Sequence, residues 1–163
     1  MKGETLPHKD CVKYLGCYLD RGLYWKTHIK SKRDQMNICF NKMNWLLGRR
    51  SKLSLANKLL IYNVILKPVW TYALELWGSA STSNIEIIQR LQNKVLRCIS
   101  NAPWFTRNEE IHGYLEIPTI KEEIQKRTKT YIIRLQHHVN PLAAGILDTS
   151  NDVSRLKRKR IVT

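Results

Sequence analysis

Apolar residues recur every three or four positions through most of this chain, and this spacing constrains its fold more than any other feature. In a helix of 3.6 residues per turn such residues share one face, whereas a half-buried strand would need strict alternation. The first such segment runs from about Lys26 to Leu47, and Gly48 ends it. Its narrow apolar stripe consists of Trp25, Ile29, Met36, Phe40, Met43 and Leu47. We therefore predict a mainly α protein.

A second helix is predicted from Leu55 to about Trp77. Ser54 is a good N-cap for it, because a serine hydroxyl can accept a bond from a free amide of the first turn. Pro68 lacks a backbone donor and should kink or break the helix. The apolar arc is broad, so we expect this helix to be central and mostly buried. Ile61, Ile65 and Tyr72 extend the arc.

Ser83 and Thr119 are each followed three positions later by glutamate, a pattern typical of capping boxes. Ser83-x-x-Glu86 predicts a helix from about Asn84 to Ser100, and Thr119-x-x-Glu122 predicts another to about His138. The inward residues of the last helix are expected to be Ile120, Ile124, Tyr131 and Leu135. A short helix around Asn108 to Leu115 fits between the two.

Residues 11–20 differ from the rest of the chain. They combine β-branched and aromatic residues around Gly16, and Asp20-Arg21-Gly22 then marks a turn. These features favour a strand or a short hairpin.

Positive charge concentrates between Lys26 and Lys58. The chain has 28 lysines and arginines against 13 acidic residues, for a formal net charge of +15. So strong an excess of positive charge usually serves to bind a polyanion. In this stretch nine residues are basic and only Asp34 is acidic. We interpret this stretch as a surface that binds along a phosphate backbone and displaces the counterions condensed on the nucleic acid. The alternative is that the cations only keep exposed helix faces soluble.

Two further features carry less weight. Arg90, Lys94 and Arg97 would form a second basic row opposite the core, although a plain solvated face explains them as well. Trp45 projects away from the apolar stripe of its helix. It could stack on a base or pack against a neighbouring domain.

The sequence offers no catalytic or metal-binding arrangement. It has no adjacent aspartate pair, no G-x-x-x-x-G-K-[ST] loop and no cysteine pair at zinc spacing. His137 and His138 are adjacent at a helix end, where they would point about 100° apart. We therefore predict no catalytic residue, no metal ligand, no cofactor and no small-molecule substrate for this chain.

The chain also lacks an apolar run long enough for a membrane span, and its N-terminus lacks the apolar stretch of a secretory signal. We expect a protein of the nucleus or cytoplasm that is not secreted and has no membrane partner. Whether Met1 is a true start stays open.

Several motifs resemble one family in the order in which they occur. They are Val12-Lys13-Tyr14-Leu15-Gly16, Trp25-x-x-His28-Ile29, Leu46-Leu47-Gly48-Arg49-Arg50-Ser51-Lys52-Leu53-Ser54, Ile65-Leu66-Lys67-Pro68-Val69-Trp70, Ala102-Pro103-Trp104 and Ile117-Pro118-Thr119. Over residues 12–125 the chain resembles the reverse transcriptases of non-LTR retrotransposons of the jockey group, in the part that follows the catalytic palm.

The resemblance implies a fold and a division of the chain. Residues 1–24 would be the end of the palm with a primer-grip-like hairpin, and 25–101 a thumb-like helical bundle. Residues 102–147 would form a C-terminal helical extension. Independently of the resemblance, the run of basic residues at 155–160 predicts a basic, disordered tail over 148–163. The catalytic aspartates and their Mg²⁺ would belong to a Tyr-Ala-Asp-Asp-type motif that does not occur in this chain. Its partners would be the RNA/DNA template–primer and the upstream fingers–palm region.

The resemblance and the charge together define a candidate site. The residues implied at the primer terminus are Lys13, Tyr14, Leu15 and Gly16. The residues expected at phosphates are Lys26, Lys30, Arg33, Arg49, Arg50 and Lys52. Two other interpretations stay open: a non-enzymatic helical module that binds protein, with its charge serving solubility, and a degenerate fragment of a mobile element.

Overall fold

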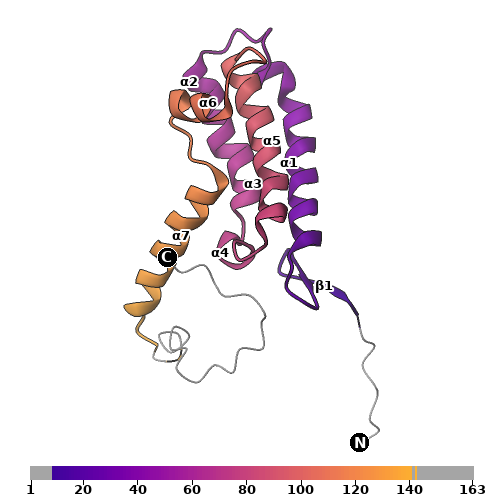
Figure 1. The fold of residues 1–163 in the computed structure, drawn as a ribbon, viewed down its shortest axis with the longest axis vertical. Coiled ribbons are helices and arrows are strands. Elements are labelled where there is room, and N and C mark those ends of the chain that lie inside the picture. The colour runs from indigo at the N-terminus through magenta and orange to yellow at the C-terminus, as the bar shows by residue number, and fades with distance from the viewer. Residues whose placement is uncertain (1–8, 141, 143–163) are drawn as a thin grey trace, which may run out of the picture.

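The protein is mainly α, with a short N-terminal β-hairpin, as predicted (Figure 1). The computed structural model describes residues 9–140 and 142. Its elements are β1 (Cys11–Tyr14), β2 (Cys17–Asp20), α1 (Lys26–Leu47), α2 (Leu55–Ile61), the π-helical turn η1 (Tyr62–Leu66), α3 (Lys67–Thr71), α4 (Leu74–Trp77), α5 (Thr82–Ser100), α6 (Asn108–Leu115) and α7 (Ile120–Gln136). The predicted tail at 148–163 lies outside the described residues, as do residues 141 and 143–147 of the predicted extension.

Helix α1 has the bounds that its apolar stripe predicts. Trp25, Ile29, Met36, Phe40 and Leu47 are all buried, and Met43 packs against the same core. The helix ends where Gly48 donates its N–H to the carbonyl of Asn44 at 2.7 Å. A side chain at Gly48 would place its Cβ 2.5 Å from that carbonyl oxygen, so the residue must be glycine for the chain to turn here.

Helices α1 and α5 pack side by side and run in the same direction (Figure 1). At their starts, the amide of Asn84 donates to the carbonyl of Tyr24 at 3.0 Å. At their ends, the thiol of Cys98 lies 3.9 Å from the carbonyl of Leu47. The loops that follow the two helices, residues 48–54 and 101–107, therefore leave the bundle at the same end.

The predicted second helix is broken into four pieces. Pro68 lies in the first turn of α3, and η1 precedes it, closed by the N–H of Lys67 donating to the carbonyl of Tyr62. The full break falls later, where Tyr72 is extended and Ala73 is left-handed with φ 55°. Because the π turn shifts the helical register and Tyr72 leaves the helix, the prediction that Ile65 and Tyr72 extend a buried arc is wrong. Both side chains are exposed.

The two predicted capping boxes have different outcomes. The box at Thr119 is confirmed: its hydroxyl accepts from the N–H of Glu122, whose carboxylate accepts from the N–H of Thr119. The box at Ser83 is wrong, because α5 begins two residues earlier than predicted, with Ser81 in extended conformation as its N-cap. Ser83 therefore lies inside the first turn, where its hydroxyl meets that of Ser81 at 3.1 Å.

Helix α7 is attached to the bundle by charge as well as by apolar packing. The buried carboxylate of Glu123 pairs with Lys67 of α3 at 3.0 Å and with Arg127 at 3.1 Å. Burial alone would raise the pKa of Glu123, but the hydrogen bonds from Lys67 and Arg127 outweigh it and lower the pKa. Further along, Tyr131 is exposed although Leu135, four residues later, is buried, so the prediction that Tyr131 points inward is wrong.

A buried amide joins three parts of the core. The Gln92 side chain is fully buried, and its Nε2 donates to the hydroxyl of Tyr62 and to the carbonyl of Pro118, each at 3.0 Å. These bonds connect η1, α5 and the turn before α7. A buried polar network of this kind favours one packing arrangement, because every alternative leaves a donor or acceptor without a partner.

We predict that Gln92→Leu lowers the free energy of unfolding by about 2–3 kcal/mol, since it leaves the Tyr62 hydroxyl and the Pro118 carbonyl unpaired in the core. Urea denaturation measures this loss. The matched control is Gln125→Leu on the exposed face of α7, which should change stability by less than about 0.5 kcal/mol. Equal stabilities of the two variants would contradict the role assigned to Gln92.

Candidate nucleic-acid interface

The six predicted phosphate contacts fall into two sets at opposite ends of α1. Lys26, Lys30 and Arg33 lie on one face of its first turns, three and four residues apart. Arg49, Arg50 and Lys52 lie in the loop beyond its last turn. All six side chains are exposed. A helix of 22 residues is about 33 Å long, so the structure separates the two sets instead of forming one continuous row.

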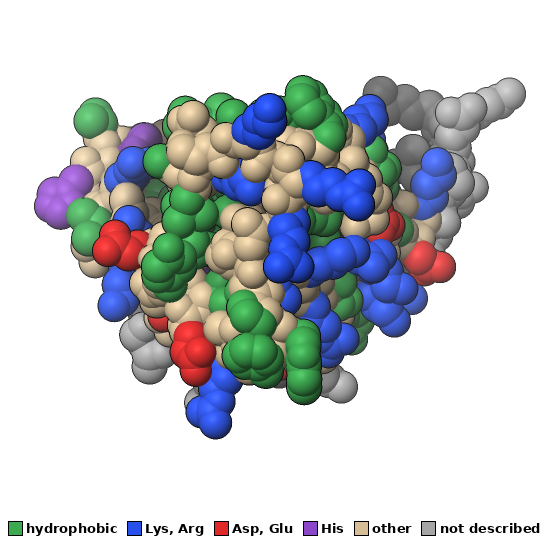
Figure 2. Space-filling model, turned by 90° about the horizontal axis from the view of Figure 1, so that it is seen from above, with side chains coloured by type: hydrophobic (Ala, Val, Ile, Leu, Met, Phe, Trp, Pro, Cys, Tyr) green, Lys and Arg blue, Asp and Glu red, His purple; other side chains and the backbone are tan. Residues whose placement is uncertain are grey.

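Local carboxylates neutralise little of this charge. Within residues 9–140, Arg33 is the one member of the six in an ion pair, with its neighbour Asp34 at 2.9 Å. Both side chains of that pair are more than half exposed, and such pairs contribute little and give way easily. In Figure 2, which looks onto one end of the bundle, basic side chains gather on one side of the exposed face.

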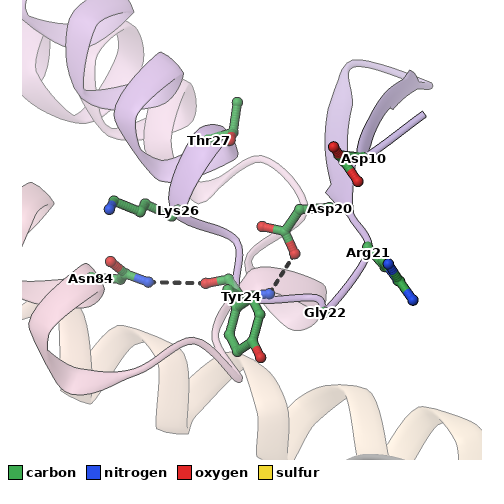
Figure 3. A pocket seen from close by; sticks show the side chains of 8 residues that line it. All are labelled: Asp10, Asp20, Arg21, Gly22, Tyr24, Lys26, Thr27 and Asn84. Atoms are coloured by element: carbon green, nitrogen blue, oxygen red, sulfur yellow. Dashed lines mark hydrogen bonds between the residues drawn. The ribbon is translucent and has the colours of Figure 1, made fainter.

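A pocket of about 420 Å³ lies beside the first set, between the hairpin and the start of α1 (Figure 3). Asp10 and Asp20 contribute carboxylates to it, and Lys26 lines it but extends away from both (Figure 3). The carboxylate of Asp20 accepts the N–H of Tyr24 at 2.6 Å. Asp20 therefore holds the turn that leads into α1 and leaves the Lys26 ammonium group free for an outside anion.

Two of the nine basic residues between Lys26 and Lys58 are structural. The Lys32 side chain is mostly buried, with its Nζ 4.6 Å from the ring centroid of Tyr72, and burial lowers its pKa. The Nζ of Lys58 is buried as well, and it donates to the carbonyl of Gly48 at 3.0 Å, at the negative end of α1. Both side chains therefore have contacts within the protein, which periodicity alone did not reveal.

The predicted second basic row is not a continuous cationic surface. The guanidinium of Arg97 donates to the carbonyls of Pro103 and Thr106 at 2.6 and 2.7 Å, and to the Oδ1 of Asn108 at 3.0 Å. Arg97 therefore does not contribute a free cation to that row, because the loop after α5 folds back over its guanidinium. Arg90 pairs with Glu86 at 3.5 Å on the exposed face.

The hairpin presents its tip to solvent. Tyr14 and Leu15 are largely exposed, and the left-handed pair Leu15 and Gly16 (φ 45° and 76°) makes the tight turn between β1 and β2. Lys13 lies on the exposed side of β1, with its Nζ 5.4 Å from the ring centroid of Tyr18. All four predicted primer residues therefore lie together on one small element.

Tyr72 fixes this tip to the bundle. Its hydroxyl donates to the carbonyl of Leu15, and its ring lies 3.4 Å from where a Cβ of Gly16 would be. The side chain can reach the hairpin because the chain is extended at Tyr72, between α3 and α4. The sequence gives no local signal for this role of Tyr72, although Pro68 predicts that the helix is interrupted nearby.

His28 holds the other side of the hairpin. The ring is fully buried, and its Nδ1 accepts the N–H of Tyr18 at 3.4 Å. Its Nε2 has no hydrogen-bond partner among the described residues. Burial, helped by the nearby charge of Lys32, lowers the pKa of His28 to about 4. The ring is therefore neutral at physiological pH, as its role as an acceptor requires.

The described residues form no site for catalytic metal ions. Nowhere in that part of the chain do three or more histidine, cysteine or acidic side chains gather as a metal would require. The four cysteines are free thiols. No helix within the same residues has the length and apolarity to cross a bilayer.

Known proteins with similar sequences indicate the family to which this chain belongs. The chain is 43% identical over 155 residues to a probable RNA-directed DNA polymerase from the transposon X-element of Drosophila melanogaster, across 95% of this chain and 17% of the relative. It is 42% identical over 143 residues to the RNA-directed DNA polymerase from the mobile element jockey of Drosophila funebris (88% and 16%). The jockey polymerase of Drosophila melanogaster is 38% identical over 161 residues (99% and 18%). No protein-family model and no solved structure matches the chain.

Over nearly all of its length, the chain is homologous to RNA-directed DNA polymerases encoded by mobile elements. Within that class it belongs with the non-LTR retrotransposon polymerases of the jockey and X-element kind, which confirms the resemblance that its motifs indicate. The chain spans 16–18% of the length of these relatives.

The buried, neutral His28 predicts a loss of stability in acid. Because its pKa in the folded protein lies below the ordinary value of 6.5, protons bind the unfolded chain more tightly. This contribution is complete above about pH 6.5 and is lost as the pH falls toward 4. We expect the free energy of unfolding to drop by about 2 kcal/mol between pH 6.5 and 5, as measured by urea denaturation.

In His28→Gln this part of the pH dependence should disappear. His137→Gln, which changes an exposed histidine at the end of α7, should keep it. A His28→Gln protein that still loses stability as steeply as the native chain over this range would show that another group is responsible.

Proposed function

We propose that this part of a non-LTR retrotransposon polymerase holds the template–primer duplex, with the hairpin at the primer terminus and α1 along the phosphate backbone. The observation that carries the proposal is the placement of five cations without ion pairs at the two ends of one rigid helix. Their separation of about 33 Å approaches one turn of B-form DNA, roughly 34–36 Å. Two phosphate contacts one turn apart fall on the same side of a duplex.

The position of the hairpin indicates which end of α1 would lie at the primer terminus. Because Tyr18 bonds to His28 and Tyr72 bonds to Leu15, the hairpin lies at the end of α1 that carries Lys26 and Lys30. A duplex whose primer terminus meets Tyr14 and Leu15 would run along α1 toward Arg49 and Arg50. The backbone contacts carry no base information, so binding would be independent of sequence.

The chemistry of nucleotide addition would then belong to another part of the polymerase. Among the described residues, no three histidine, cysteine or acidic side chains gather as metal ligands would. The contribution of the described residues to RNA-templated DNA synthesis would be to position the primer terminus for the fingers–palm region, which would be their protein partner. We place this work in the nucleus or cytoplasm, where template and primer are found.

The salt dependence of binding tests the proposal. With an RNA–DNA hybrid longer than one helical turn, the affinity should fall steeply and linearly on a log–log plot against salt, since each neutralised phosphate releases counterions. Arg49→Ala/Arg50→Ala should flatten the slope by roughly 1–2. Fluorescence anisotropy of a labelled hybrid over a series of salt concentrations gives this slope.

The matched control is Lys121→Ala/Lys126→Ala on α7, which removes the same charge from exposed positions away from the proposed path. Its slope should equal that of the native chain. Equal slopes for both double variants would mean that only net charge matters. A native chain that binds no hybrid even at low salt would favour a protein-binding helical module instead.

A further inference from the structure

The loop after α5 exposes two large aromatic side chains. Trp104 is 89% exposed and Phe105 is 70% exposed, and their rings meet edge to face with centroids 5.9 Å apart and planes at 83°. Because Trp104 projects almost entirely into solvent, its ring faces are open. The core does not use these side chains, and exposed aromatic groups of this kind usually mark a binding surface.

The loop is held in place from below. Arg97 donates hydrogen bonds to Pro103, Thr106 and Asn108, so one guanidinium fixes both sides of the aromatic pair. The backbone of Thr106 also turns back to the carbonyl of Pro103 at 3.2 Å. Because the loop is already fixed, it loses little conformational entropy when a ligand binds to its rings.

The surroundings of the loop favour an anionic ligand. Since α1 and α5 are parallel, the loop leaves the bundle at the same end as Arg49, Arg50 and Lys52, and Arg107 is exposed at its own end. Figure 2 shows basic and hydrophobic side chains next to each other on the end of the bundle that it views. Exposed rings beside cations are the combination that binds single-stranded nucleic acid, through base stacking and phosphate contacts.

We propose that Trp104 and Phe105 form a stacking site for unpaired bases of single-stranded nucleic acid, with Arg49 and Arg50 at the adjoining phosphates. The inference extends the proposed function, because it places unpaired template beyond the duplex that α1 would hold. Every base has an aromatic face, so the site would accept any sequence. An uncharged protein partner would gain nothing from the arginines.

The test compares a single strand with a blunt duplex. Trp104→Leu/Phe105→Leu keeps two apolar side chains but removes both aromatic rings. The Kd of the full chain for oligo(dT) should rise about five-fold or more, since stacking on one side chain is worth roughly 1–3 kcal/mol per base. The Kd for a blunt RNA–DNA hybrid should stay unchanged. Trp104→Tyr, which keeps an aromatic face, should bind oligo(dT) nearly as well as the native chain.

Tyr131→Leu on α7 is the matched control, because it removes an exposed aromatic ring away from this end of the bundle. Its affinity for oligo(dT) should not change. Urea denaturation of each variant checks that the fold is intact, as expected for side chains this exposed. Unchanged oligo(dT) binding by the double leucine variant would overturn the proposal. So would a change in self-association, seen by sedimentation, without a change in oligo(dT) affinity, because the loop would then be a protein contact.

The site and the proposed function fail separately. If the native chain binds the blunt hybrid but not oligo(dT), the stacking site is wrong and the duplex grip stands. If Trp104→Leu/Phe105→Leu weakens oligo(dT) binding but Arg49→Ala/Arg50→Ala leaves the salt slope for the hybrid unchanged, the proposed duplex contact is wrong and the stacking site stands.

Discussion

The parallel packing of α1 against α5 determines where everything else in this protein lies. The apolar stripe from Trp25 to Leu47 is buried against α5 and its neighbours, and this contact fixes the two helices along their full length. One end of the pair then receives the hairpin, through His28 and Tyr72. The other end receives the loops at 48–54 and 101–107. Without this packing, the two sets of cations and the exposed aromatic pair would have no fixed relation to one another.

Local patterns predicted the elements well, because those patterns are physical causes that act within a few residues. The stripe of α1, the Gly48 stop and the Thr119 box each depend on neighbours in the same turn, and the structure has all three. The hairpin at 11–20 was predicted for the same reason. What failed were predictions of which face is buried over long helices. Ile65 and Tyr72 are exposed, because a π turn and a backbone break ended the regular pattern, and Tyr131 of α7 is exposed as well.

The candidate site was less predictable than the fold, because a sequence counts charges without showing what they meet. Lys32, Lys58 and Arg97 look like solvent-facing cations in a helical pattern, yet each is used inside the protein. One lies under the Tyr72 ring, one binds the end of α1, and one fixes the loop with Trp104. That this loop and Arg49 and Arg50 leave the bundle at the same end depends on a contact between segments about fifty residues apart, and no local signal could reveal it.

The central claim is that the exposed lysines at the two ends of α1 touch phosphates, and their chemical reactivity measures this directly. The chain can be acetylated with and without a bound RNA–DNA hybrid longer than one helical turn, and the rate at each lysine read by mass spectrometry. Acetylation of Lys26, Lys30 and Lys52 should be slower in the complex, whereas the acetylation rates of Lys121, Lys126 and Lys129 on α7 should be unchanged. Equal protection of all six, or protection of the α7 lysines alone, would contradict the claim.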